Sequence, residues 1–238
     1  MNGETHLGLR GVAARALIVT GVMLVVALAL RLGTQVSTLE PMWDEPLMQP
    51  VVAAIVERGW SVDTAIDYED TKGPIFFWTY AAIAGLMDAE VPSLRLISLA
   101  LFILTGIPLG IVAALCALSP GRTAALAALY ALLPYNAVLG QLFMSEPSFL
   151  FGAVALVAVF IWGFGAAPSS RRTVVGAVAF AVILSMLLHH RTFAVALGGA
   201  AVLVAAARDR WRSWPWWAAV AVAGLSRLPL FLRWGGTV

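Results

Sequence analysis

The run "PIFFWTYAAIAGLM", residues 74–87, decides the fold of this chain, because its length leaves two topologies open. As an α-helix it covers roughly 21 Å, whereas the hydrocarbon core of a bilayer is roughly 30 Å thick. It then meets Asp88, Glu90 and Pro92, which do not continue an apolar helix. The run either crosses a membrane with a poor match of length, or lies at one side and turns back.

The composition of the whole chain indicates a multi-pass helical membrane protein. Of its 238 residues, 61% are hydrophobic and 12% are charged, and the mean hydropathy is +0.90. The single cysteine, Cys116, excludes a disulfide framework and a cysteine metal site. The net charge of only +2 gives no sign of nucleic-acid binding. Further apolar runs occur at about 14–32, 96–118, 123–140, 147–167, 173–188, 192–207 and 215–233.

The distribution of basic residues favours the topology in which residues 74–87 do not cross. In that topology eight basic residues face the cytoplasm: Arg10, Arg15, Arg122, Arg171, Arg172, Arg208, Arg210 and Arg212. Four face outside: Arg58, Lys72, Arg95 and Arg191. If the run crosses, every later loop changes side and the count becomes four inside and eight outside. Cytoplasmic loops carry the excess of Lys and Arg, so the first topology is preferred.

The predicted fold class is therefore an all-α polytopic membrane protein with about seven transmembrane helices and a cytoplasmic N-terminus. Residues 1–238 form one transmembrane domain, in which the first external loop covers about 33–95. This loop carries a short amphipathic helix, roughly 47–58, and the half-buried helix 74–87. The same topology places "MSEP" (144–147) and "HHRT" (189–192) on the external side, together with that loop.

Acidic residues gather in the first external loop, where eight of the 13 in the chain lie between residues 33 and 73. Asp44 and Glu45 follow the first span within "MWDEP", between two prolines that restrict the local backbone. A carboxylate near low-dielectric surroundings serves as a general base, because burial raises its proton affinity; it also binds divalent cations. The other reading is a hydrated charged loop, and this reading is favoured for Asp63, Asp67, Glu69 and Asp70.

Lys72 lies just before the half-buried helix, where Pro74 suits the first helical turn. A lysine at a helix N-terminus opposes the helix dipole but suits an anion site, since the ammonium and the free N–H groups both favour a phosphate there. The aromatic residues that follow, Phe76, Phe77, Trp78 and Tyr80, are expected to form an interfacial belt.

Two further candidates lie at the ends of later spans. Glu146 lies immediately before the run 147–167. An ionisable residue at a membrane edge indicates a function, while stabilisation of the helix N-terminus is the alternative. Arg191 suits bidentate phosphate binding, and a polar hairpin turn is its alternative. The side chains of the adjacent His189 and His190 would point in different directions on a helix, so a two-histidine metal site is not expected.

Several motifs in this order resemble the GT-C superfamily of membrane glycosyltransferases. They are "DE" after the first span, an amphipathic helix, "TKGPIFFW", "LRLISLALFILTG" and "ALYALLPYNAVLGQLFMSEPSFLF". The resemblance covers roughly residues 10–210 and extends to protein O-mannosyltransferases, the lipid A aminoarabinose transferase and the glucosyltransferases of lipid-linked oligosaccharide assembly.

The resemblance implies an inverting enzyme that moves a sugar from a polyprenyl-phosphate donor to a lipid, glycan or protein acceptor at the external face of the membrane. It implies Asp44 as the catalytic acid of the first loop and Glu45 as its partner. Lys72 and Arg191 are the expected donor-phosphate ligands, and Glu146 is expected to bind the acceptor or a metal. A divalent cation is the one cofactor left open. The implied location is the cell envelope, as a multi-pass protein of the bacterial plasma membrane.

Two other classes stay open from the sequence. A transporter would use the acids as a substrate or proton site, although they lie outside the spans and not at the midplane expected of transporters. The second class is a non-catalytic membrane partner subunit, or an inactive truncated module.

Overall fold

The structure, a computed structural model, is an all-α bundle described for residues 8–35, 39–59, 72–164, 171–209 and 213–233. Five helical segments are long and apolar enough to cross a membrane. They are α1 (Leu9–Thr34), α5–α6 (Val91–Leu104 and Gly106–Leu115), α9 (Ser145–Phe164), α10 (Arg171–Leu188) and α12–α13 (Trp214–Ser226 and Leu228–Arg233). These helices agree with a multi-pass membrane protein.

Two of the seven expected spans are not among the five long helical segments. The run 123–140 is divided into α7 (Pro120–Leu132) and α8 (Pro134–Leu139). The division falls at Leu133, whose ψ of 125° is extended because the following proline disfavours the helical conformation. The run 192–207 is a 3₁₀ turn, η2 (Thr192–Ala194), followed by α11 (Val195–Asp209). The apolar helix over Thr192–Ala207 is unbroken but shorter than the five long segments, and the count of seven stays a prediction.

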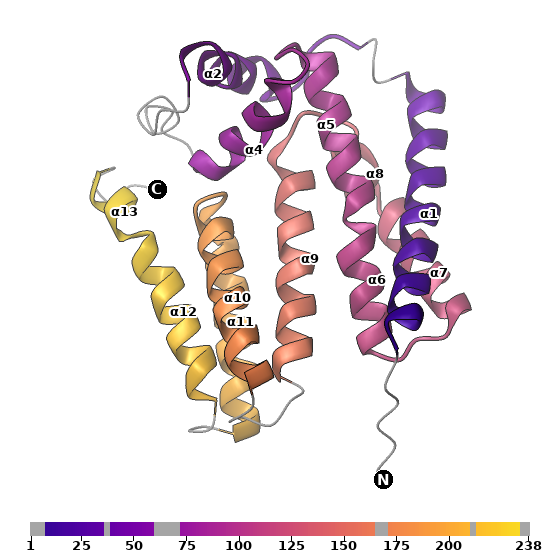
Figure 1. The fold of residues 1–238 in the computed structure, drawn as a ribbon. Helices are drawn as coiled ribbons and strands as arrows, with labels where there is room; N and C mark the ends of the chain where they lie inside the picture. The colour runs from indigo at the N-terminus through magenta and orange to yellow at the C-terminus, as the bar shows by residue number, and fades with distance from the viewer. Residues whose placement is uncertain (1–7, 36–38, 60–71, 165–170, 210–212, 234–238) are drawn as a thin grey trace.

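Two helices lie together at one end of the bundle, where α1 ends and α5 begins (Figure 1). They are α2 (Glu45–Arg58) and α4 (Pro74–Ala84). Helix α2 buries Met48, Val52 and Ile55, which a helical spacing of three or four residues places on one face. Helix α4 has 11 residues, which corresponds to roughly 17 Å, and it does not run along the length of the bundle.

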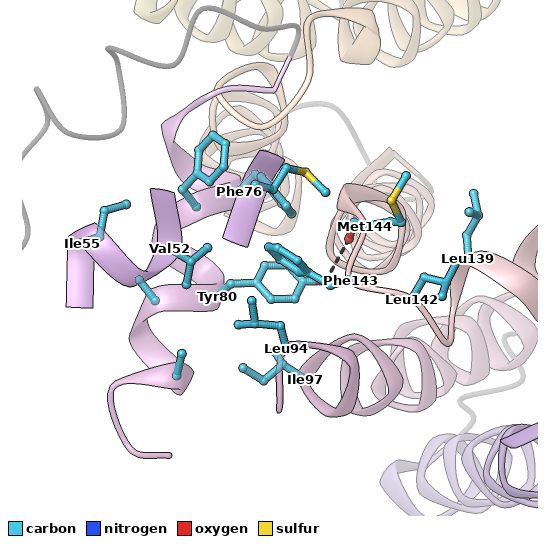
Figure 2. Packing of buried hydrophobic residues seen from close by; sticks show 14 residues of the cluster. Val52, Ile55, Phe76, Tyr80, Leu94, Ile97, Leu139, Leu142, Phe143 and Met144 are labelled. Atoms are coloured by element: carbon cyan, nitrogen blue, oxygen red, sulfur yellow. Dashed lines mark hydrogen bonds between the residues drawn. The ribbon is translucent and has the colours of Figure 1, made fainter. Parts of the chain in front are cut away.

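The aromatic residues of α4 form the centre of a buried cluster and not an interfacial belt, so that expectation was wrong for three of its four members. Phe76, Phe77 and Tyr80 are fully buried, and Phe143 stacks on Phe76 with ring centroids 5.7 Å apart. The Tyr80 hydroxyl donates to the carbonyl of Met144 over 2.9 Å (Figure 2). Packing against α2 and α5 buries more apolar area than a place at the interface would. The cluster thereby fixes residues 142–144 beside α4.

Candidate functional site

A short backbone pairing joins the start of α4 to the turn after α10. Lys72 and Arg191 form an isolated antiparallel bridge. The N–H of Gly73 donates to the carbonyl of His190 over 2.9 Å, and the N–H of Ile75 donates to the carbonyl of His189 over 3.3 Å. A Cβ atom on Gly73 would lie 1.9 Å from the His189 carbonyl oxygen, so only glycine permits this approach. Two segments more than a hundred residues apart in sequence are thus held in register.

The same pairing overturns one reason for expecting a phosphate at the N-terminus of α4. The N–H groups of Gly73 and Ile75 already donate to the histidine carbonyls, and Pro74 has no N–H. The N–H of Phe76 donates to the carbonyl of Gly73 over 3.2 Å. The backbone N–H groups that bind anions at other helix N-termini are therefore occupied here. Any anion binding at this position depends on side chains.

Each cation of the bridge contacts a carboxylate from a third or fourth segment. Lys72 Nζ lies 2.9 Å from Asp44 Oδ2, and Arg191 Nη2 lies 2.8 Å from Glu146 Oε1. The side chains of Lys72, Arg191 and Glu146 are 5%, 15% and 10% exposed, whereas that of Asp44 is 45% exposed. The structure thus brings four of the five expected site residues into two adjacent ion pairs.

Glu45, the fifth expected residue, forms a buried ion pair of its own with Arg95. The Arg95 guanidinium donates to Glu45 through Nε over 2.9 Å and Nη2 over 2.5 Å, and both side chains are fully buried. The carboxylate also accepts from the N–H groups of Met42 and Phe143, each over 2.8 Å. Four donors therefore converge on Glu45. A carboxylate surrounded in this way positions its neighbours, and these contacts leave it poorly placed to react with a substrate.

The turn that carries Asp44 is shaped by this buried carboxylate. Glu45 donates its own N–H to the Met42 carbonyl over 3.0 Å, while its side chain accepts from the Met42 N–H. Trp43, between them, has a φ of 53°, in the left-handed region that few non-glycine residues adopt. Asp44 then precedes α2, with its side chain directed toward Lys72. The buried Glu45 carboxylate thus fixes a tight turn, and this turn places the exposed Asp44 carboxylate beside Lys72.

His190 is buried beside the bridge and is neutral at physiological pH. Its Nε2 lies 2.7 Å from the Ser148 hydroxyl, and Nδ1 has no hydrogen-bond partner within the described ranges. Burial, and then the charge of Arg191, lower the pKa of His190 to about 3. The ring packs edge-on against Phe76, with centroids 5.6 Å apart. A neutral ring avoids a third positive charge next to Lys72 and Arg191.

An apolar cavity of about 320 Å³ has His190 and Ser148 in its lining. Helices α4, α5, α9 and α10 line it, with side chains that include Ile75, Thr79, Phe151, Ile183 and Leu187. Thr79, Ser148 and His190 contribute its polar groups, and the rest of the lining is apolar. His190 is the residue before Arg191, so one part of the lining adjoins the ion pairs, although neither Lys72 nor Arg191 lines the cavity. A cavity lined in this way suits an apolar chain.

A resident metal ion finds no ready set of ligands in the part of the chain that the structure describes. No group of three or more His, Cys, Asp or Glu side chains lies close enough there to hold one. Asp44 and Glu146 each face a cation instead. The acids Asp63, Asp67, Glu69 and Asp70 lie outside the described residues. We therefore derive no step through a metal.

Sequence reasoning counted Arg95 only as an external charge and did not single out Ser148 or Tyr135. Arg95 had a detectable signal, since an arginine inside "VPSLRLISLALF" is costly unless it is paired. Its partner, Glu45, was not readable from spacing. The Tyr135 hydroxyl lies 3.3 Å from Glu146 Oε1, but its run gave no polar pattern that would indicate this contact.

Comparisons of the chain with protein-family models, with curated proteins and with solved structures gave no match.

Proposed function

We propose that this chain is a membrane glycosyltransferase of the GT-C type, which transfers a sugar from a polyprenyl-phosphate donor to an acceptor with inversion. The observation that carries the proposal is the pairing of Lys72 with Arg191 beside Asp44, next in sequence to His190, which lines an apolar cavity. Two cations suit a phosphate, the cavity suits a prenyl chain, and the exposed carboxylate suits a base. The order of motifs in the sequence supports the same superfamily.

In the proposed reaction, Asp44 accepts the proton of an acceptor hydroxyl as its oxygen attacks the anomeric carbon. The bond from that carbon to the phosphate oxygen breaks, and the polyprenyl phosphate leaves with the electron pair. Lys72 and Arg191 stabilise the charge that develops on the leaving phosphate. Such electrostatic stabilisation is strongest where water is excluded. The buried pair of Glu45 and Arg95 holds the turn of Asp44 in place. Glu146 holds Arg191.

The proposed topology counts α7–α8 and α11 as crossings in addition to the five long helical segments. With seven spans and the N-terminus in the cytoplasm, the site lies at the external face of a bacterial plasma membrane. The distribution of basic residues supports this orientation. The acceptor would be a lipid, glycan or protein of the cell envelope.

Binding of a polyprenyl monophosphate tests the donor class directly. We expect the purified chain in nanodiscs to bind a photoactivatable polyprenyl monophosphate, with cross-links on the α4, α9 and α10 residues of the cavity. Lys72→Met removes one charge-assisted hydrogen bond and should weaken binding by about 10- to 100-fold. Arg122→Met, at an exposed arginine remote in sequence from the site, is the matched control and should bind as the wild type does.

The neutral polyprenol with the same tail is the matched probe. Equal affinity for the alcohol and the monophosphate, or an unchanged affinity in Lys72→Met, would contradict a phosphate site at Lys72. Retained thermal stability of that variant shows that weaker binding does not come from unfolding.

A further inference from the structure

The ion pairs of the site have a consequence for the order of events, because both cations are neutralised before any ligand arrives. Residues directly opposite one another in an antiparallel bridge have Cβ atoms roughly 5 Å apart, and like charges there repel. Lys72 and Arg191 are such a pair. Asp44 and Glu146 supply two negative charges against their two positive charges. The carboxylates therefore act as internal counter-ions in the empty site.

The two counter-ions differ in how firmly they are held. Glu146 has a side chain that is only 10% exposed, and its carboxylate also lies within 3.3 Å of the Tyr135 hydroxyl and 3.4 Å of the Ser145 hydroxyl. Asp44 is 45% exposed, and its carboxylate contacts the ammonium of Lys72 over 2.9 Å. Water can replace Lys72 at Asp44 far more easily than it can replace the partners of Glu146. An incoming anion should therefore displace Asp44 first.

Arg191 can accept a ligand without giving up its carboxylate. Its Nη2 contacts Glu146, while its Nε is buried and has no hydrogen-bond partner within the described ranges. The ring of Phe193 lies 5.3 Å from the guanidinium carbon and helps to fix its plane. Among the described residues, Arg191 thus retains an unpaired Nε–H donor in addition to the Nη2 group that Glu146 occupies.

We propose that a single donor phosphate exchanges with Asp44 at Lys72 and takes Arg191 Nε as its second donor, so that donor binding releases the catalytic carboxylate. This inference rests on the proposed function and adds a control to it. Before the donor binds, the Lys72 ammonium lies 2.9 Å from Asp44 Oδ2, so this carboxylate oxygen is occupied. After the exchange, Asp44 is free to accept the acceptor's proton. The donor therefore binds before the acceptor is activated.

Affinity for a polyprenyl monophosphate without a sugar tests the exchange, with the chain in phosphatidylcholine nanodiscs. Asp44→Asn removes the carboxylate that competes with the phosphate in the ion pair with Lys72 and should tighten binding about fivefold, as expected for one partly exposed ion pair. Glu146→Gln is the matched control, because it removes the same charge from the same cluster. Glu146→Gln should not tighten binding, because in the wild type the phosphate does not displace Glu146 from Arg191. In the Asp44→Asn/Lys72→Met double variant the gain should disappear.

The outcomes separate this inference from the function on which it rests. Lys72-dependent binding that is unchanged or weaker in Asp44→Asn overturns the exchange and leaves the donor site standing. Equal tightening by Asp44→Asn and Glu146→Gln would reveal a general charge effect and also overturns it. No binding by the wild type overturns the donor site and the exchange together. Inorganic phosphate, which lacks the tail, should compete weakly; competition equal to that of the lipid would identify a free-phosphate site instead and overturn the lipid assignment.

Discussion

Asp44→Asn is expected to lower sugar transfer by about 10²- to 10⁴-fold, the usual contribution of a positioned general base. The amide cannot accept the acceptor's proton, but the backbone carbonyl of residue 44 still accepts from the N–H groups of Leu47 and Met48 at the start of α2. The fold should therefore persist. Transfer is measured with a labelled polyprenyl-phosphate sugar, in membrane vesicles whose only active copy is the variant.

The control for that experiment is Glu40→Gln, which neutralises an exposed acid in the same loop. It should leave turnover within about twofold of the wild type, because surface charges away from the reacting atoms contribute little. Turnover by Asp44→Asn that equals the turnover of this control would remove Asp44 from the mechanism. A loss of transfer accompanied by a loss of thermal stability would point to unfolding instead.

Arg95→Met is expected to destabilise the chain by about 3–5 kcal/mol, the effect of leaving a buried carboxylate without its partner. Glu45 would keep the N–H groups of Met42 and Phe143 but lose the guanidinium, and it is fully buried. The free energy of unfolding is measured by denaturant titration in mixed micelles. The double variant Glu45→Leu/Arg95→Met removes both charges and should be less destabilised than the sum of the two single variants.

Arg122→Met is again the control, because that arginine is exposed. Its free energy of unfolding should lie within about 0.5 kcal/mol of the wild type. A loss in Arg95→Met no larger than in this control would show that the buried pair does not hold the turn of Asp44. Strict additivity in the double variant would mean that Glu45 and Arg95 act independently.

The sequence predicted the all-α membrane class and the nearness of the polar segments more successfully than it predicted contacts. One count of basic residues indicated that residues 74–87 turn back, and with that choice Asp44, Glu146 and Arg191 lie at one end of the bundle. The ion pairs at Lys72 and Arg191 agree with that placement. Their roles in binding and catalysis stay predictions.

The details that sequence reasoning missed depend on tertiary packing. Aromatic residues on a short apolar helix suit an interface or a core equally, and only the presence of α2 and Phe143 decides that Phe76 and Tyr80 are buried. Likewise, the histidine carbonyls occupy the N–H groups of Gly73 and Ile75 through a contact between distant segments. Both depend on which segments meet, which local pattern does not reveal.

The division between α7 and α8 was readable from the sequence, in contrast. Pro134 inside the run 123–140 restricts Leu133 to extended conformations. The apolar composition of the run did not reveal this break, because hydropathy does not distinguish one helix from two consecutive helices.

We propose that segments far apart in the sequence form one site at one side of the membrane, and labelling of single cysteines tests this arrangement most directly. In a Cys116→Ser background, cysteines are introduced singly at Glu40, Tyr135, Phe193 and Arg122, which are all exposed. A membrane-impermeant maleimide added to intact cells should label positions 40, 135 and 193, and position 122 only after permeabilisation. Labelling of position 40 from one side and of 135 or 193 from the other would contradict the shared site.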